Sequence, residues 1–255
     1  MPNNRTTNST GGLIAVIPAR YGSTRFPGKP LALIHGKPMI QWVCEQADKS
    51  QTVDDVVVAT DDKRIFRTVE EFGGKAVMTA TEHRTGSDRI AEAVEDIECD
   101  FVINLQGDEP LLPADVIDQL AASLKTENCR MATVAVPFEN VHHEVTNPNA
   151  VKVVTDGNDF ALYFSRSPIP FCRDGNEVFT PLLHWGLYGY SKEFLLQFVK
   201  WPPGRLEQTE QLEQLRALEN GADIKVIRVN TPTHGVDTPE DIEIIENMLT
   251  ASGAT

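Results

Sequence analysis

Short apolar runs alternate with amphipathic stretches over the first half of the chain. The apolar runs at residues 14–17, 56–60, 75–78 and 101–105 predict buried strands, and apolar residues spaced three or four positions apart predict helices at 37–50, 65–72, 88–97 and 113–124. Strands that alternate with helices imply a mostly parallel sheet joined by right-handed crossovers.

The spacing of the apolar runs changes beyond residue 125. Strand-like runs follow one another closely at 131–137, 151–155, 160–165 and 183–190, which is typical of antiparallel pairing. Helices are predicted at 206–219 and 239–249, and Thr238 and Pro239 suit the N-cap and first position of the second one. We therefore expect one α/β domain at residues 13–250, with a mixed sheet and an inserted β lobe, preceded by a flexible polar tail at residues 1–12.

Composition excludes several classes of protein. The 255 residues carry a formal net charge of −14, which argues against a nucleic-acid-binding surface. No apolar run approaches transmembrane length, and we expect no signal peptide, because the first apolar run is short and ends at Pro18. The four cysteines are scattered without a C-x-x-C pair, as in a reduced, cytoplasmic protein.

The loop after the first predicted strand concentrates groups that bind anions. Glycines let backbone N–H groups approach an anion, hydroxyls add donors, and cations neutralise charge. The loop carries all three kinds: Arg20, Gly22, Ser23, Thr24, Arg25, Gly28 and Lys29. No Asp or Glu occurs before Glu45. The loop therefore predicts a polyphosphate site, with a solvated surface loop as the alternative.

Neither common phosphate-binding motif fits this loop. Five residues separate Gly22 from Gly28, and Pro30 replaces the hydroxyl residue of a Walker A motif. No G-x-G-x-x-G fingerprint follows the strand either, which argues against an ordinary dinucleotide site. A nucleoside triphosphate that binds without either motif therefore remains the expected ligand.

Further polar clusters follow other predicted strands, at Asp61-Asp62 and at residues 106–109. Ligands of open α/β sheets bind outside the carboxyl ends of strands. Asp108 suits a Mg²⁺ ion that bridges phosphate oxygens, and its alternative role is a turn aspartate that caps the next segment. Asp237 lies outside the predicted helix cap and is available as a second metal ligand.

Nearly the whole chain, residues 13–250, resembles the 3-deoxy-manno-octulosonate cytidylyltransferase (CMP-Kdo synthetase) family. The resemblance rests on an ordered set of strings: IPARYGSTRFPGKPL, VVVATDD, INLQGDEP, NPNAVKVV, ALYFSRSPIP, GLYGY, LEQLRAL and GVDTPED. It implies a three-layer α/β/α fold of the nucleotide-diphospho-sugar transferase type and a homodimer formed through a β insertion at about 131–190. It further implies the reaction of CTP with Kdo to CMP-Kdo and pyrophosphate, with Mg²⁺, in the cytoplasm, for lipopolysaccharide biosynthesis.

The resemblance also assigns site residues. It implies catalytic roles for Lys29, Asp108 and Asp237, the last two as metal ligands. The implied nucleotide-binding residues are Arg20, Ser23, Arg25, Lys29, Thr85, Gly86, Ser87 and Arg89. The implied sugar-binding residues are Gln106, Arg166, His184, Tyr188, Glu213 and Gln214, with Arg166 as the partner of the sugar carboxylate.

Two departures from the family pattern stand out. The segment 85–89 reads Thr-Gly-Ser-Asp-Arg where relatives often read Ser-Gly-Thr-Glu-Arg, which leaves individual contacts open. Trp185 stands where a smaller aliphatic residue is usual, next to the expected sugar site. Surface solvation for Glu213 and Gln214 is the alternative to sugar binding, since both lie beside a leucine stripe.

Other functions remain as alternatives. The same chemistry on 8-amino-Kdo or on sialic acid is the nearest, and the sialate-activating family usually lacks the SRSPIP, GLYGY and LEQLR strings. A glycosyltransferase would usually carry a D-x-D motif, where this chain has Gly107-Asp108-Glu109. A catalytically silent nucleotide-binding regulator would be expected to lack Lys29, Asp108 or Asp237.

Overall fold

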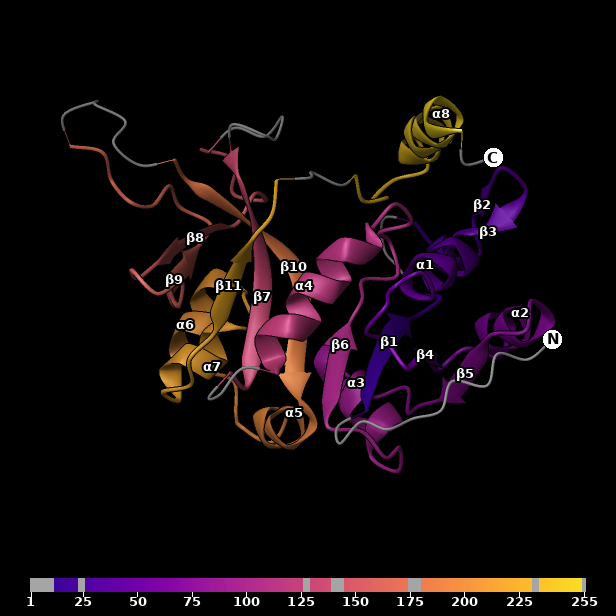
Figure 1. Ribbon diagram of the computed structural model, residues 1–255, viewed down its shortest axis with the longest axis horizontal. Helices are drawn as coiled ribbons and strands as arrows, with labels where there is room; N and C mark the ends of the chain where they lie inside the picture. Colours follow the sequence, from indigo (N-terminus) through magenta and orange to yellow (C-terminus); the bar gives the residue numbers. More distant parts are fainter. Residues whose placement is uncertain are drawn as a thin grey trace.

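A nine-stranded sheet forms the centre of the computed structural model, which describes residues 12–22, 26–125, 129–138, 145–173, 180–230 and 234–253 (Figure 1). The main strand order is β11-β7-β10-β6-β1-β4-β5, and β8 and β9 branch from β10. The strands are β1 (Leu13–Ala19), β4 (Asp55–Thr60), β5 (Lys75–Met78), β6 (Phe101–Asn104), β7 (Met131–Pro137), β8 (Lys152–Thr155), β9 (Ala161–Ser165), β10 (Leu182–Ser191) and β11 (Lys225–Arg228). A separate small sheet pairs β2 (Leu33–Ile34) with β3 (Lys37–Pro38).

The strand directions confirm a mixed, mostly parallel sheet. β1 pairs in parallel with both β4 and β6, and β4 pairs in parallel with β5. β10 runs antiparallel to its neighbours β6 and β7, while β11 is parallel to β7. The carboxyl ends of β1, β4 and β6 therefore meet at one edge, where the early half of β10 also lies.

Helices cover both faces of this sheet and make the expected three layers. The helices are α1 (Met39–Ala47), α2 (Lys63–Glu71), α3 (Gly86–Val94), α4 (Ala114–Leu124), α5 (Lys192–Phe198), α6 (Arg205–Glu210), α7 (Leu215–Glu219) and α8 (Asp241–Ser252). Leu13, Ala15 and Ile17 of β1 join the core beneath α1, α2 and α4, whereas Ile14 and Val16 join the core beneath α3, α5 and α7. This alternation follows from the two-residue period of a strand.

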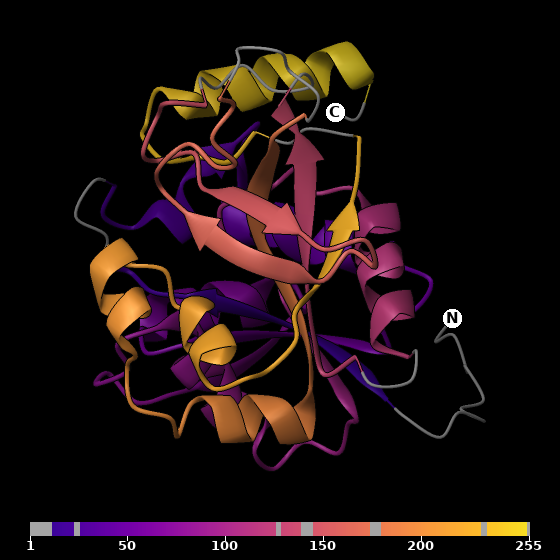
Figure 2. The same ribbon diagram turned by 90° about the vertical axis from the view of Figure 1, so that its left-hand side faces the viewer.

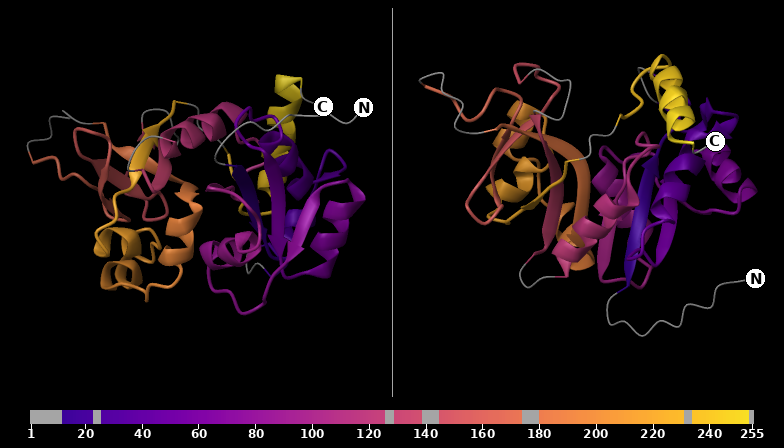
Figure 3. Two further views of the ribbon diagram at one scale, coloured as in Figure 1. Left: turned by 60° about the horizontal axis from the view of Figure 1, so that its bottom comes forward. Right: turned by 45° about the horizontal axis from the view of Figure 1, so that its top comes forward.

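Two parts of the chain extend from this three-layer body. The β8–β9 pair is antiparallel and stands in front of the central sheet in Figure 2. The last helix, α8, lies beside the first part of the chain, yellow next to indigo in Figure 3, because Ile245 and Leu249 pack against Met39 and Trp42.

None of the helices in the described ranges has the length and apolar character needed to cross a bilayer. The predicted tail lies outside the described residues apart from Gly12.

The predicted helix at 206–219 is wrong as one continuous element. It is broken into α6 and α7, because Gln211 adopts a left-handed conformation with φ of 53°. The backbone carbonyls of Glu210 and Gln211 accept hydrogen bonds from the Arg166 guanidinium at this break. Leu212 and Leu215 are nevertheless both buried, so the spacing of the apolar residues continues although the chain changes direction at Gln211.

The start of the last helix also differs from the expectation. α8 begins at Asp241 rather than at Pro239, and the preceding turn is tight, with Asp241 N donating to Thr238 O at 3.2 Å. The Asp241 carboxylate accepts from the backbone N–H groups of Asp237 and Thr238, both at 2.8 Å. The Thr238 hydroxyl donates to Asp241 Oδ2 at 3.2 Å rather than accepting from a helix N–H, so the predicted N-cap role of Thr238 is wrong. The sequence patterns also failed to indicate α5 and β11, which span seven and four residues.

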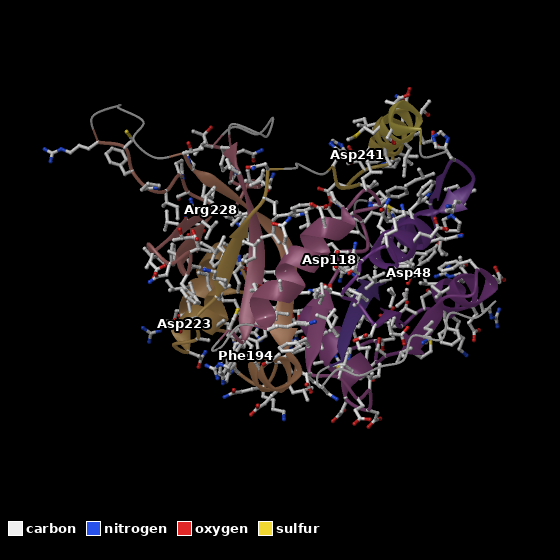
Figure 4. The ribbon with its side chains drawn as sticks, viewed as in Figure 1. Asp48, Asp118, Phe194, Asp223, Arg228 and Asp241 are labelled. Atoms are coloured by element: carbon white, nitrogen blue, oxygen red, sulfur yellow. The ribbon has the colours of Figure 1, made fainter. Side chains whose placement is uncertain are left out.

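Asp118 on α4 holds the loop that follows α1 (labelled in Figure 4). Its Oδ1 accepts from Ser50 Oγ at 2.6 Å, from Thr52 Oγ1 at 2.7 Å and from Gln51 N at 3.0 Å. Burial alone would raise the pKa of this carboxyl, but these hydrogen bonds outweigh it and hold the pKa below its ordinary value of 3.8. The loop therefore depends on an ionised Asp118.

We expect Asp118→Ala to lower the free energy of unfolding at pH 7 by about 1–3 kcal/mol, the cost of unpaired donors. A carboxyl whose folded-state pKa is depressed stabilises the fold above its unfolded pKa, and this contribution is lost as pH falls through the folded pKa. The difference between variant and parent, measured by urea unfolding, should therefore shrink below pH 4. An equal difference at pH 7 and at strongly acidic pH would contradict the ionic role of Asp118.

Candidate active site

A cavity of about 350 Å³ opens at the carboxyl edge of the parallel strands. Its walls come from the end of β1, the turn before α1, the start of α3, the loop after β6 and the segment before α8. The lining residues are Pro18, Ala19, Arg20, Lys29, Pro30, His83, Arg84, Thr85, Gly86, Arg89, Gln106, Gly107, Asp108 and Asp237. Segments that are far apart in the sequence therefore meet at the carboxyl ends of the strands, where we expected a ligand to bind.

Lys29 occupies the centre of the polar contacts in this cavity. Its Nζ donates to Asp108 Oδ2 at 2.6 Å and to the Val236 carbonyl at 2.8 Å, and it lies 4.0 Å from Asp237 Oδ1. Gly28 makes this placement possible, because its φ is 73° and an added Cβ would lie 3.0 Å from the Tyr21 ring. Gly28 N also donates to Tyr21 O at 2.9 Å and closes the loop.

The two candidate metal ligands, Asp108 and Asp237, both lie within 4.0 Å of Lys29 Nζ. Their segments are joined by a backbone hydrogen bond of 2.9 Å from Val236 N to Asp108 O. Within the described ranges, no group of three or more His, Cys, Asp or Glu residues converges as a metal site. Mg²⁺ commonly binds proteins through one or two carboxylates and takes its other ligands from phosphates and water. Two carboxylates at the mouth of a cationic cavity fit that donor set.

The cavity also presents cations. Arg89 is only 4% exposed and is held by Asp61 Oδ2 at 2.7 Å and by Thr79 Oγ1 at 2.5 Å. Arg20 and Arg84 are exposed and form no ion pair in the part of the chain that the structure describes. Charges without a protein partner are the ones that an anionic ligand can neutralise. The Arg89–Asp61 contact also brings the polar cluster after β4 to the same edge.

The start of α3 supplies another wall of the cavity. Thr85 caps the helix through its hydroxyl, which accepts from Asp88 N at 3.1 Å, and Asp88 accepts from Thr85 N in return. This capping box accounts for Thr85 and Asp88 structurally. Helix N-termini also favour anions and hydrogen-bond acceptors. Thr85, Gly86 and Arg89 line the cavity, whereas Ser87 points elsewhere, and Ser23 and Arg25 lie outside the described residues.

His184 and Tyr188 of β10 form a half-buried aromatic wall. Their ring centroids lie 5.5 Å apart, and His184 Nε2 lies 3.1 Å from Thr133 Oγ1, within hydrogen-bonding distance. Burial lowers the pKa of His184 to about 3 and raises that of Tyr188. Both side chains are therefore uncharged at neutral pH, and they offer hydrogen bonds without adding charge.

Glu213 joins this wall to the start of α3. Its Oε2 accepts from Ser87 Oγ at 2.8 Å. Burial raises the pKa of Glu213, and the hydrogen bond from Ser87 and the nearby Arg216 charge oppose that rise. Of the two residues with surface solvation as their alternative role, Gln214 is buried and Glu213 is half-buried. Within the described residues, three buried polar side-chain atoms lack a hydrogen-bond partner, and all belong to this region or to the end of β6: Asn104 Oδ1, Glu213 Oε1 and Gln214 Nε2.

The remaining predicted sugar residues already have protein partners. Gln106 lines the cavity, and its Nε2 donates to the Gly186 carbonyl at 2.9 Å. Arg166 donates to three backbone carbonyls, those of Glu210 at 2.7 Å, Pro148 at 2.9 Å and Gln211 at 3.3 Å. A guanidinium has five N–H donors, so two remain for a carboxylate. The predicted role of Arg166 stays a prediction.

The sequence arguments missed several residues of this site. His83 and Arg84 line the cavity next to the predicted segment 85–89, and the charge of Arg84 was the available signal. Asn104 is 4% exposed at the end of a hydrophobic strand, and a polar residue in that position was a second signal. The polar cluster at residues 106–109 includes Glu109, but no local pattern indicated its contact with Trp185, which depends on the pairing of β6 with β10.

Residues 14–224 match the cytidylyltransferase family. The chain is 52% identical over 252 residues to the 3-deoxy-manno-octulosonate cytidylyltransferase of Thermodesulfovibrio yellowstonii, a match that covers 92% of this chain and 97% of that protein. It is 50% identical over 244 residues to the protein of the same name from Vibrio parahaemolyticus, covering 92% of this chain and 96% of that one.

Solved structures agree with these sequence matches. A CMP:2-keto-3-deoxy-manno-octonic acid synthetase complexed with CTP superposes with a TM-score of 0.90 at 42% identity, over 94% of this chain and 99% of that one. The 4-diphosphocytidyl-2C-methyl-D-erythritol synthase of Anaerococcus prevotii superposes with a TM-score of 0.61 at 11% identity, over 94% of this chain and 96% of that one. The second likeness shows the fold alone.

Proposed function

The chain belongs to the cytidylyltransferase family, and from that premise we propose how its residues divide the work of the reaction. The protein transfers CMP from CTP to the anomeric hydroxyl of Kdo and releases pyrophosphate. The anomeric oxygen forms a bond to the α-phosphorus, the bond from that phosphorus to the bridging oxygen of the β-phosphate breaks, and the hydroxyl proton is released. Positioning and charge neutralisation dominate such transfers.

The cations that line the cavity are the main support for the proposed binding mode of CTP. Arg20 and Lys29 bind the triphosphate, together with Ser23 and Arg25 of the same loop. The start of α3 binds the cytidine side through Thr85, Gly86 and Arg89, which line the cavity, and Ser87 supports it through its hydrogen bond to Glu213. Arg20 supports this assignment because it lines the cavity without an ion partner among the described residues, and Arg89 because Asp61 fixes its orientation.

The sugar binds beside the aromatic wall of β10. His184 and Tyr188 provide uncharged hydrogen-bonding groups. Glu213 Oε1 and Gln214 Nε2 provide an acceptor and a donor that are buried and lack a hydrogen bond among the described residues, and Glu213 Oε1 lies 3.6 Å from the Arg216 guanidinium. A polyol needs this mixture of donors and acceptors. Gln106 and Arg166 complete the site, with the two remaining N–H donors of Arg166 directed to the sugar carboxylate. The hydrogen bond from Ser87 to Glu213 then links the two substrate sites.

Asp108 and Asp237 would hold Mg²⁺. A bound Mg²⁺ ion neutralises charge on the phosphate oxygens and lowers the pKa of a neighbouring hydroxyl. The protein's own contribution is to hold the two carboxylates near Lys29, whose ammonium group keeps them from repelling one another. We also propose a single domain at residues 13–250, a homodimer formed through residues 131–190, and a place for the product in lipopolysaccharide biosynthesis in the cytoplasm.

Release of pyrophosphate tests this function directly. The purified chain is incubated with Mg²⁺ and each of the four ribonucleoside triphosphates, with and without Kdo. We expect release only when CTP and Kdo are both present. Competition with 8-amino-Kdo then measures the sugar preference, for which we expect Kdo to be favoured. Release with another triphosphate, none with any pairing in folded protein, or a strong preference for the amino sugar would contradict the function stated here.

A further inference from the structure

Trp185 does not face the aromatic wall that its neighbour His184 forms. Trp185 and Leu187 belong to the core beneath α1, α2 and α4, whereas the His184 ring contacts Phe164 in the core on the opposite face of the sheet. Successive side chains of a strand point to opposite faces, which explains the separation. The unusual tryptophan of this chain therefore acts on the far side of β10 from His184.

The polar edge of Trp185 contacts the loop that carries Asp108. Trp185 is 9% exposed, and its indole Nε1 donates to Glu109 Oε1 at 2.9 Å. A second contact ties the same loop to β10, because Gln106 Nε2 donates to Gly186 O at 2.9 Å. The pairing of β10 with β7 is irregular between Trp185 and Tyr188, at the point where both contacts are made.

Glu109 also lies against the segment that carries Asp237. A Cβ on Gly235 would lie 3.3 Å from Glu109 Oε1 and 3.6 Å from Asp108 O, so the two backbones approach closely at this glycine. The next residue, Val236, donates its N–H to Asp108 O and accepts from Lys29 Nζ. The Glu109 carboxylate is thus in contact with β10 on one side and with the Asp237 segment on the other.

We propose that Trp185 is a positioning residue, whose indole N–H fixes Glu109 and so sets the placement of Asp108 relative to Asp237. The inference rests on the proposed function, in which these two carboxylates hold a divalent cation with CTP. A hydrogen bond to a carboxylate is among the stronger ones in proteins, and the buried indole ring has little freedom to move. Partners of metal ligands commonly change metal affinity by about 10–100-fold when they are lost.

The test uses Mn²⁺ as a spectroscopic probe, titrated into the full chain with CTP but without Kdo, so that no turnover occurs. Free Mn²⁺ is measured by electron paramagnetic resonance. Trp185→Phe keeps an aromatic ring and removes the donor, and we expect it to weaken Mn²⁺ binding about tenfold. Affinity for CTP without metal should stay unchanged. Trp201→Phe, which alters an aromatic cluster with Phe194 and Phe198 around α5, is the matched control and should bind Mn²⁺ as the parent does.

A double-mutant cycle separates positioning from packing. If Trp185 acts through Glu109, then Glu109→Ala alone weakens Mn²⁺ binding, and Trp185→Phe adds no further loss to it. Additive losses, or Trp185→Phe with parental Mn²⁺ affinity, would overturn the proposal. Should Trp185→Phe fail to fold, parental Mn²⁺ affinity in Glu109→Ala would overturn it equally. Failure of the parent chain to bind Mn²⁺ with CTP would instead count against the proposed metal site itself.

Discussion

Asp108→Asn is expected to lower turnover by about 10²–10⁴-fold while leaving the fold intact. The substitution keeps the size of the side chain and removes its charge. Asp108 Oδ2 lies 2.6 Å from Lys29 Nζ, and the loop around it is held by backbone contacts that asparagine preserves, including the hydrogen bond from Val236 N to Asp108 O. The substitution therefore removes negative charge from the cavity and leaves the fold unchanged.

Pyrophosphate release at saturating CTP and Kdo measures this loss, and thermal unfolding checks the fold. Asp223→Asn is a matched control, since Asp223 is an exposed aspartate beside α7 and away from the cavity (Figure 4). It should turn over at the parental rate. Parental turnover in folded Asp108→Asn protein would remove Asp108 from the reaction.

Lys29→Met is expected to reduce kcat/KM for CTP by about 10²–10³-fold. Methionine approximates the length of the lysine stem but lacks the ammonium group that contacts Asp108 and the Val236 carbonyl. The variant loses the cation that we propose neutralises phosphate, and it removes the ammonium group that lies 2.6 Å from Asp108 and 4.0 Å from Asp237. Binding of CTP should therefore weaken together with the chemical step.

Initial rates over a range of CTP concentrations separate the two effects, because an interaction made equally before and during the transition state changes KM alone. Lys49→Met serves as the control, since Lys49 is exposed and donates only to Gln46 in the described structure. An unchanged kcat/KM in folded Lys29→Met protein would show that the ammonium group has no part in catalysis or nucleotide binding.

The sequence predicted the cavity better than it predicted the contacts of individual residues. Arg20, Lys29 and Asp108 converge because polar residues after parallel strands share one edge, a rule that needs only the order of the elements. The bond between Lys29 and Asp108 follows from that convergence. Residue roles such as metal binding remain predictions, since geometry alone does not identify a ligand.

Single-residue conformations and tertiary partners lay beyond the sequence patterns. The leucine spacing around residues 206–219 satisfies a helix, but it does not register the left-handed Gln211 that divides α6 from α7. The partners of Arg166 arise from that same break, because it exposes backbone carbonyls. The sequence also did not show which face of the sheet the Trp185 side chain occupies, because that depends on the position of Trp185 in β10.

Arg20 and Arg84, which form no ion pair with another described residue, have a kinetic consequence for a molecule with a net charge of −14. Within about a Debye length of the surface, about 8 Å at physiological ionic strength, an approaching triphosphate meets the repulsive field of the acidic surface. Attraction to Arg20 and Arg84 acts only once the anion reaches the cavity mouth. Moderate salt screens the long-range repulsion more than the short-range attraction, so it speeds the encounter with nucleotide. The same field hastens the departure of pyrophosphate once it leaves the cations.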